Sequence, residues 1–247
     1  MSNDKQEELE NQQEEFDNEL DETTEYTTRK EGINNFVEKN SKNIIIFSIA
    51  IVVLIGLVLL FRSNSKQNEE NATIALARIE SFYLRGEYET ALYGNDTLPT
   101  IRGERIMGLV EIVKEYGSTS AGQRAALYAG EACFMLGKYP ESKGFYEKAI
   151  KSSIDVVKAG GLAGSAACNE KDGKIKEAAA EYKKAAGLIV DDLLRLRYLY
   201  FAALCNEKSG NNEEAKRIYR NIISLNKFGE FNNLAKAGIV RLGEDIE

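Results

Sequence analysis

The sequence predicts an all-α protein in which a single N-terminal transmembrane helix precedes an α-solenoid of antiparallel helix pairs. Three observations lead to this fold class. Residues 44–61 form an apolar run without a charge, and a glycine-containing motif recurs from Gly137 onward. The composition also favours helix, since Ala, Glu, Lys and Leu dominate and the only prolines are Pro99 and Pro140.

The apolar run reads IIIFSIAIVVLIGLVLLF and has eighteen residues, of which only Ser48 and Gly56 interrupt the large aliphatic surface. As a helix it would be about 27 Å long, close to the ~30 Å hydrocarbon thickness of a bilayer. A helix on the surface of a soluble protein would have a polar stripe, and this run has none. We therefore predict that residues 44–61 span a lipid bilayer.

The charges that flank the run predict its orientation. Lys and Arg tend to stay on the cytoplasmic side, so the larger basic cluster places the N-terminus in the cytoplasm and the C-terminal domain on the periplasmic side. Four basic residues come before the run and two come soon after it: Arg29, Lys30, Lys39 and Lys42, then Arg62 and Lys66.

The chain divides into five predicted regions. They are an acidic disordered arm (1–28), a juxtamembrane segment (29–43), the transmembrane helix (44–61), a linker (62–71) and the solenoid (72–247). The solenoid is expected to contain units of about 72–122, 123–158, 159–195 and 196–229, and a capping helix over 230–247 that covers the last interface.

Charge is distributed unevenly along the chain. The arm holds eleven acidic residues against Lys5 alone, and the rest of the chain has 31 basic and 28 acidic residues. Neither region has the concentrated basic face that nucleic acid requires, so we expect no nucleic-acid partner. The arm is predicted to be a solvated tail; alternatively, a short helix there recruits a basic partner through Leu9, Phe16 and Leu20.

The residues that usually carry chemistry are scarce. The chain has no histidine, which removes the commonest general base and metal ligand. Cys133, Cys168 and Cys205 lie 35 and 37 residues apart without a CxxC pair, so we expect them to be buried on separate helices of the repeat. The acidic residues form no catalytic constellation. We expect no enzyme activity, no catalytic residue, no metal, no cofactor and no small-molecule substrate.

Internal repetition is the most informative signal after residue 72. The segments that start at Gly137, Gly173 and Gly210 share a small residue five positions on and a tyrosine nine positions on. Such a period indicates two helices per unit, with glycine in a left-handed turn between them. The shared positions are Ser142, Ala178 and Ala215 for the small residue, and Tyr146, Tyr182 and Tyr219 for the tyrosine.

The first unit is longer than the others. A weaker copy of the motif starts at Gly86, and Gly137 follows it by 51 residues. We predict a turn around Pro99 and an amphipathic helix over residues 105–116. The extra length is explained by a displaced or lengthened second helix.

Stacked helix pairs form a curved surface whose inner wall is lined by the first helix of each pair. Mixed aromatic and charged groups on that wall suit an extended or helical peptide. Counting back from the turn glycines, the predicted partner-binding residues are Tyr83, Arg124, Leu127, Glu131, Phe134, Glu170, Arg197, Tyr200 and Glu207.

At these residues the domain resembles tetratricopeptide repeats, which mediate protein–protein interaction. Gly130, Gly137, Tyr139, Tyr146 and Ala149 follow the pattern of that family. The first helix of each unit lacks the usual early aromatic residue, and no proline closes a unit. The resemblance covers residues 72–245 and implies the fold.

The longer first unit is similar to that of the ancillary SecYEG translocon subunit (YfgM) family, through Gly108, Ile112, Tyr116 and Gly122. That resemblance implies a scaffold in the bacterial inner membrane with a periplasmic domain. The implied partners are Sec translocon components, a membrane-anchored periplasmic chaperone and exported clients. The alternative is a structural subunit of another cell-envelope assembly or secretion complex.

Overall fold

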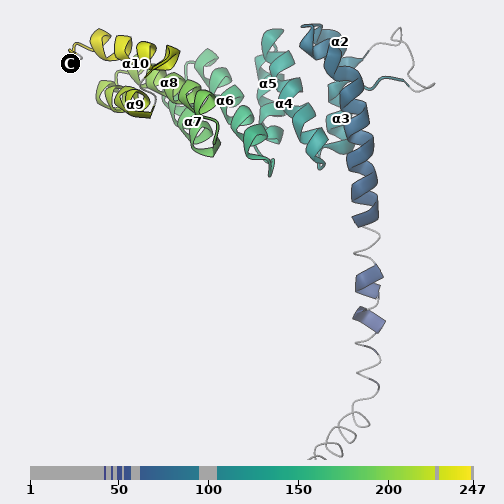
Figure 1. Ribbon diagram of the computed structural model, residues 1–247. Helices are drawn as coiled ribbons and strands as arrows, with labels where there is room; N and C mark the ends of the chain where they lie inside the picture. The colour runs from purple at the N-terminus through teal and green to yellow at the C-terminus, as the bar shows by residue number, and fades with distance from the viewer. Residues whose placement is uncertain are drawn as a thin grey trace, which may run out of the picture. The chain divides into compact units, whose positions relative to one another are not determined.

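A computed structural model of the chain describes residues 42, 46, 49–51, 53–56, 62–94, 105–225 and 228–245 (Figure 1). It divides the chain into two compact parts, Met1–Ser63 and Asn64–Glu247. In the described residues every regular element is a helix, which confirms the predicted all-α class. The arm (1–28) and, apart from Lys42, the juxtamembrane segment (29–43) lie outside the described residues.

Most of the predicted transmembrane helix also lies outside the described residues. Those that are described within it are helical, and their large apolar side chains are 51–64% exposed, as in Ile46, Val53 and Leu54. Within the described part of the chain, no single helix is both long enough and apolar enough to cross a membrane.

The second part is a succession of helices. Residues 64–84 are helical. The helices that follow are α2 (Tyr88–Tyr93), α3 (Leu109–Tyr116), α4 (Ser120–Met135), α5 (Tyr139–Ala149), α6 (Asp155–Lys171), α7 (Ile175–Leu188), α8 (Asp192–Lys208), α9 (Asn212–Leu225) and α10 (Glu230–Arg241).

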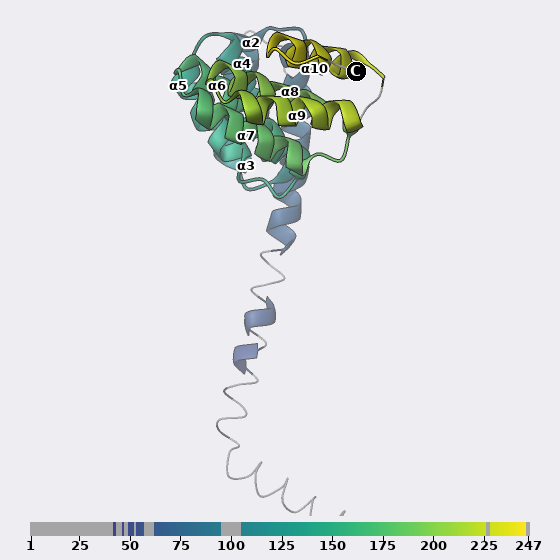
Figure 2. The ribbon, with the colours of Figure 1, turned by 90° about the vertical axis from the view of Figure 1, so that its left-hand side faces the viewer.

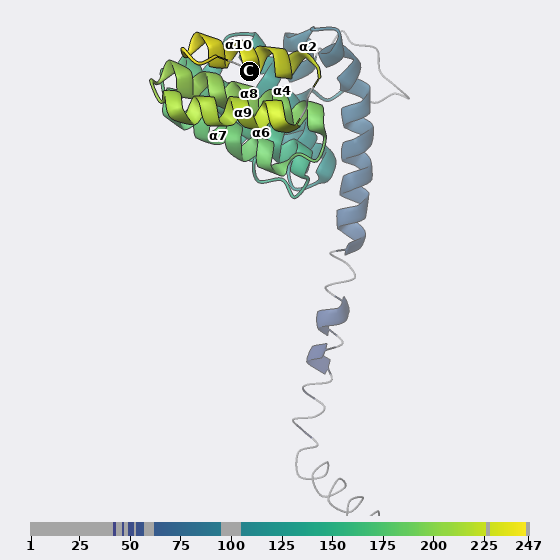
Figure 3. The same cartoon turned by 60° about the vertical axis from the view of Figure 1, so that its left-hand side comes forward.

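Consecutive helices pack against each other in chain order from α3 to α10, as an α-solenoid requires. Two other views of the same ribbon show α10 beside α9 (Figures 2 and 3). In each repeat unit we call the helix before the turn glycine helix A and the helix after it helix B. The 64–84 helix, α4, α6, α8 and α10 are helices A.

The turn glycines have the left-handed conformation that the repeat predicts. The φ angles of Gly137, Gly173 and Gly210 are 75°, 75° and 77°, and that of Gly86 is 78°. At the first of these the Gly137 N–H donates to the Phe134 carbonyl at 3.0 Å, and the next N–H reaches the Cys133 carbonyl at 2.8 Å. These bonds satisfy carbonyls at the end of helix A and recur at each turn.

The structure adds a fifth turn of the same kind, which the sequence analysis missed. Gly243 follows α10 with a φ of 78°, and the carbonyls of Val240 and Ile239 accept the same two hydrogen bonds. Helix α10 therefore ends as a helix A does. It covers the face of α9 with the buried side chains of Phe231, Ala235 and Ile239.

The small residues that the repeat motif shares allow the helices to approach closely. Ser142, Ala178 and Ala215 are 0% exposed, and the Ser142 hydroxyl donates to the Gly130 carbonyl at 2.7 Å. The Tyr146 ring fills the space between two successive helices A. A Cβ atom at Gly130 or Gly164 would lie 2.7 or 2.2 Å from that ring, so both positions require glycine.

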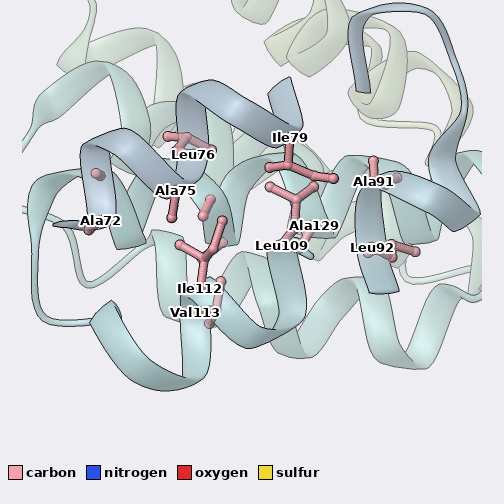
Figure 4. Packing of buried hydrophobic residues seen from close by; sticks show 14 of the residues in the cluster. Ala72, Ala75, Leu76, Ile79, Ala91, Leu92, Leu109, Ile112, Val113 and Ala129 are labelled. Atoms are coloured by element: carbon pink, nitrogen blue, oxygen red, sulfur yellow. The ribbon is translucent and has the colours of Figure 1, made fainter. Parts of the chain in front are cut away.

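After its turn glycine, the first unit has two helices, α2 and α3, where the sequence predicts one displaced or lengthened helix. Helix α3 begins at Leu109, four residues later than predicted. Only glycine fits at position 108, directly before α3, because a Cβ atom there would lie 2.5 Å from the Leu92 carbonyl oxygen. Residues 95–104, with the predicted turn at Pro99, lie outside the described residues. Figure 4 shows Leu92, Leu109 and Ile112 packed in the core of this unit.

Residues 62–71 are helical, although the sequence analysis assigns them to a linker. No glycine or proline interrupts the chain from residue 62 to residue 85, so the helix continues. Glu69 anchors this helix on α4: its carboxylate accepts the backbone N–H groups of Ser120 and Ala121 at 2.7 and 3.0 Å. The Thr119 hydroxyl accepts the Gly122 N–H at 3.0 Å, which completes the cap of α4.

The three cysteines are free and buried on α4, α6 and α8, which confirms their predicted placement. Burial raises the pKa of the Cys133 thiol to about 11 and that of the Cys205 thiol to about 12. A protonated, buried thiol is unreactive toward alkylating reagents.

Two glycines, one in the turn before α5 and one within α5, test the turn assignment. We expect Gly137→Ala to lower the free energy of unfolding by about 1–2 kcal/mol, because an alanine strains a left-handed turn. Gly144→Ala is the matched control: Gly144 lies within α5 with open space around its Cβ position, so the change should stabilise by up to about 1 kcal/mol. Urea denaturation followed by circular dichroism measures both. Equal effects would contradict the turn assignment.

The cap on α4 gives a second prediction. Glu69→Ala should lower the free energy of unfolding by about 1–2 kcal/mol, because two N–H groups at a helix N-terminus lose a charged acceptor. The neighbouring exposed Glu70 makes the control, and Glu70→Ala should change stability by less than about 0.5 kcal/mol. Thermal denaturation of both variants decides the point; similar melting curves would show that the cap contributes nothing.

Candidate functional site

The nine predicted partner-binding residues all lie on helices A. They stand 13, 10, 6 or 3 residues before the turn glycine, and such spacing places them along one face of a helix. We call this set the helix-A row. It contains Tyr83 on the 64–84 helix, Arg124, Leu127, Glu131 and Phe134 on α4, Glu170 on α6, and Arg197, Tyr200 and Glu207 on α8.

The first two helices A meet through tyrosines and glutamates. The Tyr83 hydroxyl donates to the Glu131 carboxylate at 2.6 Å, and its ring stacks on Tyr128 with centroids 4.5 Å apart. The Tyr128 hydroxyl donates to Glu80 at 3.1 Å. Burial and the Glu131 hydrogen bond raise the pKa of Tyr83, so its hydroxyl remains a donor. The structure thus brings two residues of the row, Tyr83 and Glu131, into direct contact.

The carboxylate of Glu170 joins two successive repeat units. It accepts a hydrogen bond from the Tyr182 hydroxyl on helix B of the same unit at 3.0 Å. Its other oxygen accepts from the Lys208 ammonium on the next helix A at 2.8 Å. We call this arrangement of a tyrosine, a glutamate and a positively charged side chain the inter-unit bridge.

The same bridge recurs one unit later at Glu207. The Tyr219 hydroxyl donates to it at 2.8 Å, and the Arg241 guanidinium on α10 makes two bonds, of 2.6 and 2.8 Å. The Arg241 hydrogen bonds hold the pKa of the Glu207 carboxyl below its usual range, so the bridge stays charged at neutral pH. Glu170 and Glu207 are therefore already bound within the chain.

Phe134 stands where the next upstream unit would have its bridging glutamate. Its ring lies edge-on to Tyr139, with centroids 5.2 Å apart. The basic residue at the position equivalent to Lys208 is Lys171, whose nitrogen lies 5.9 Å from the Tyr139 ring centroid. In the part of the chain that the structure describes, Lys171 forms no ion pair.

Other members of the row remain available to a partner. Arg124 and Arg197 are exposed and make no ion pair with any described residue. Tyr200 belongs to an aromatic cluster in which its centroid lies 6.1 Å from Tyr219 and 6.0 Å from Phe231. Leu127 is half-buried against Gly160 of α6. Exposed cations and aromatic rings along one row of helix positions are the kind of surface that binds peptides.

Glu170 and Glu207 are predicted from sequence as partner-binding residues, but the structure shows that side chains of the chain itself hold them. The signal was present: a tyrosine follows each glutamate by twelve residues, and Lys208 or Arg241 stands two residues before the next turn glycine. Position Gly243 was not recognised as a turn, so Arg241 had no place in the repeat register.

A cavity lies among the helices B and the turn before α9. The cavity, between α7 and α9, has a volume of about 640 Å³, and its polar lining is largely paired within the chain. Lys183 contacts Glu214 at 3.0 Å, and the Asn211 amide donates to Asn206 at 3.0 Å. The described residues contain no group of three or more His, Cys, Asp or Glu side chains placed to hold a metal ion.

Comparison with known proteins gives no relative. No family model, no curated protein and no solved structure matches the chain.

The bridge at Glu207 predicts a pH-dependent stability. Since the folded pKa of Glu207 is lowered, its contribution is present above the unfolded value of about 4.3 and is lost as pH falls through the folded pKa. We expect Glu207→Gln to cost about 1 kcal/mol at neutral pH, because the half-exposed Arg241 is screened by solvent.

The difference between Glu207→Gln and the unchanged chain should shrink as pH falls through the folded pKa of Glu207, because below it both chains are neutral at this position. Chemical denaturation at a series of pH values measures it. Glu213→Gln is the control: its side chain is 85% exposed, and we expect little effect at any pH. A pH-independent deficit would mean that Glu207 contributes through packing alone.

Proposed function

We propose that the chain is a membrane-anchored, non-catalytic scaffold whose α-solenoid holds partner proteins on the helix-A row. The anchor is the apolar run 44–61, and the solenoid stands on the periplasmic side of a bacterial inner membrane. The observation that carries the proposal is the composition of the row: Arg124 and Arg197 are exposed and make no ion pair with any described residue, and Phe134 and Tyr200 add aromatic rings to the same row.

Several features support a binding role for this surface. The backbone polar groups at the ends of helices A are satisfied by the turns, and the small residues and tyrosines between helices are buried. What remains exposed on the row is therefore not needed to pack the helices. A repeated helical scaffold with exposed rings and guanidinium groups is suited to an extended or helical segment of another protein.

The resemblance to the YfgM family supports a narrower proposal. In it the partners are Sec translocon components, a membrane-anchored periplasmic chaperone and exported clients, and the domain acts as an accessory of protein export. The sequence favours this over a structural role in another envelope or secretion complex through the first-unit pattern around Gly108 and Gly122.

Cysteine labelling tests the anchor and its orientation. The native thiols are buried, so they give a low background with a membrane-impermeant maleimide. We expect Ser118→Cys, at an exposed turn before α4, to be labelled in cells whose outer membrane has been permeabilised. Ser2→Cys should be labelled only after lysis. The opposite pattern would reverse the topology, and release of the chain by alkaline carbonate would remove the anchor.

Site-specific photocrosslinking tests the binding surface. A photoreactive phenylalanine at Tyr200 should capture a Sec component or the chaperone, whereas the same group at the exposed Ala180 on α7 should not. Mass spectrometry of the adducts identifies the partner. Capture of one other envelope complex would support the structural-subunit alternative. Equal adducts at both sites, or none, would contradict a binding role for the helix-A row.

A further inference from the structure

Four residues of the helix-A row stand three positions before a turn glycine, and two of them, Tyr83 and Phe134, are not carboxylates. Of these two, only Phe134 lies in a unit that has the tyrosine nine positions after the glycine. The turns at Gly137, Gly173 and Gly210 have the same φ and the same hydrogen bonds, so positions counted from them are structurally equivalent. Three residues before the glycine stand Phe134, Glu170 and Glu207; nine after it stand Tyr146, Tyr182 and Tyr219; two before the next turn glycine stand Lys171, Lys208 and Arg241.

The unit at Gly137 keeps both groups that hold a carboxylate in the other two units. Tyr146 is buried like Tyr182, and its hydroxyl lies near that of Ser142. Among the residues that the structure describes, no carboxylate accepts a hydrogen bond from Tyr146, although burial and the charge of Glu131 raise its pKa. The Lys171 nitrogen lies 5.9 Å from the centroid of the Tyr139 ring. The Tyr146 hydroxyl and the Lys171 ammonium thus occupy the positions that bind a glutamate in the other two units, but Phe134 stands where that glutamate would be.

The charge around this position favours an incoming anion. Glu170 and Glu207 are compensated by Lys208 and Arg241, whereas Glu131 keeps its negative charge because its partner Tyr83 is neutral. Arg124 on α4 and Arg197 on α8 carry positive charge on either side of α6 in the chain order, without an ion pair in the described structure. The uncompensated charge of the surface is therefore mainly positive.

We infer that the helix-A row binds an acidic segment of a partner protein and that one carboxylate of this segment is held by Lys171 and the Tyr146 hydroxyl. The carboxylate completes in trans the bridge that Glu170 and Glu207 make within the chain. The rings of Phe134 and Tyr139 provide the apolar contact beside it. The inference rests on the proposed binding role of this surface and specifies the chemistry of what is bound.

A pair of labelled peptides tests this with the full chain in detergent. One has two glutamates between two phenylalanines in a Gly-Ser background, and its twin has glutamines instead. Fluorescence anisotropy should show about tenfold tighter binding of the glutamate peptide, as expected for a charge-assisted contact. Lys171→Ala should reduce this preference to less than about twofold, while Lys208→Ala, whose lysine is bound to Glu170, should leave it intact.

A further variant supplies the anion from within the chain. Phe134→Glu should complete the bridge with Tyr146 and Lys171, abolish the preference for the glutamate peptide, and keep the melting temperature at or above that of the unchanged chain. Phe134→Gln, which adds no charge, should retain the preference. Circular dichroism establishes that each variant is folded, and if Phe134→Glu does not fold, the Lys171→Ala result decides alone.

The outcomes separate this inference from the proposed function. Equal binding of both peptides, or binding of neither, overturns the carboxylate site, and so does a preference that survives Lys171→Ala. In that case the crosslinks from Tyr200 still decide whether the helix-A row binds a partner protein. Loss of those crosslinks together with a persistent glutamate preference would contradict the proposed function instead.

Discussion

The three units with turns at Gly137, Gly173 and Gly210 each bury one tyrosine, and much of the architecture depends on this residue. The rings of Tyr146 and Tyr219 need space, which Gly130, Gly164 and Gly238 provide on the facing helices. The hydroxyl, taken out of water, needs an acceptor. Glu170 and Glu207 accept this hydrogen bond in their units. Their negative charge is balanced by Lys208 and Arg241, which come from the next helix A. Packing within one unit and attachment to the following unit are therefore one linked set of contacts.

The sequence allowed the helical class, the turn glycines and the buried cysteines to be predicted, because each depends on residues close together in the chain. Gly137, for example, requires only the local left-handed turn. The break between α2 and α3 could not be predicted to the residue, since Gly108 is required by the backbone at Leu92, which comes earlier in the chain. Glu69 was missed for a similar reason: the N–H groups that it accepts lie 51 and 52 residues away.

The candidate site shows the same limit. Spacing from the turn glycines placed all nine predicted residues on helices A, because register along a helix determines the face. It could not tell which of them are free. Glu170 and Arg197 carry charge on equivalent faces, yet the carboxylate is bound by Lys208 of the following unit, and the guanidinium makes no ion pair with any described residue. Availability depends on contacts between units, and a single repeat does not contain that information.

Because Phe134 stands where the other units have a bridging glutamate, the helix pairs are not all attached to each other in the same way. Charged bridges oppose the twisting of one helix pair against the next, and they secure the two joints after α6. The joint between the α4–α5 pair and α6 relies instead on close apolar packing around Tyr146 and on single contacts such as that of Lys143 with Asn169, 2.8 Å long. In the described structure, the α4–α6 joint therefore lacks the charged link that successive helices A share from α6 to α10.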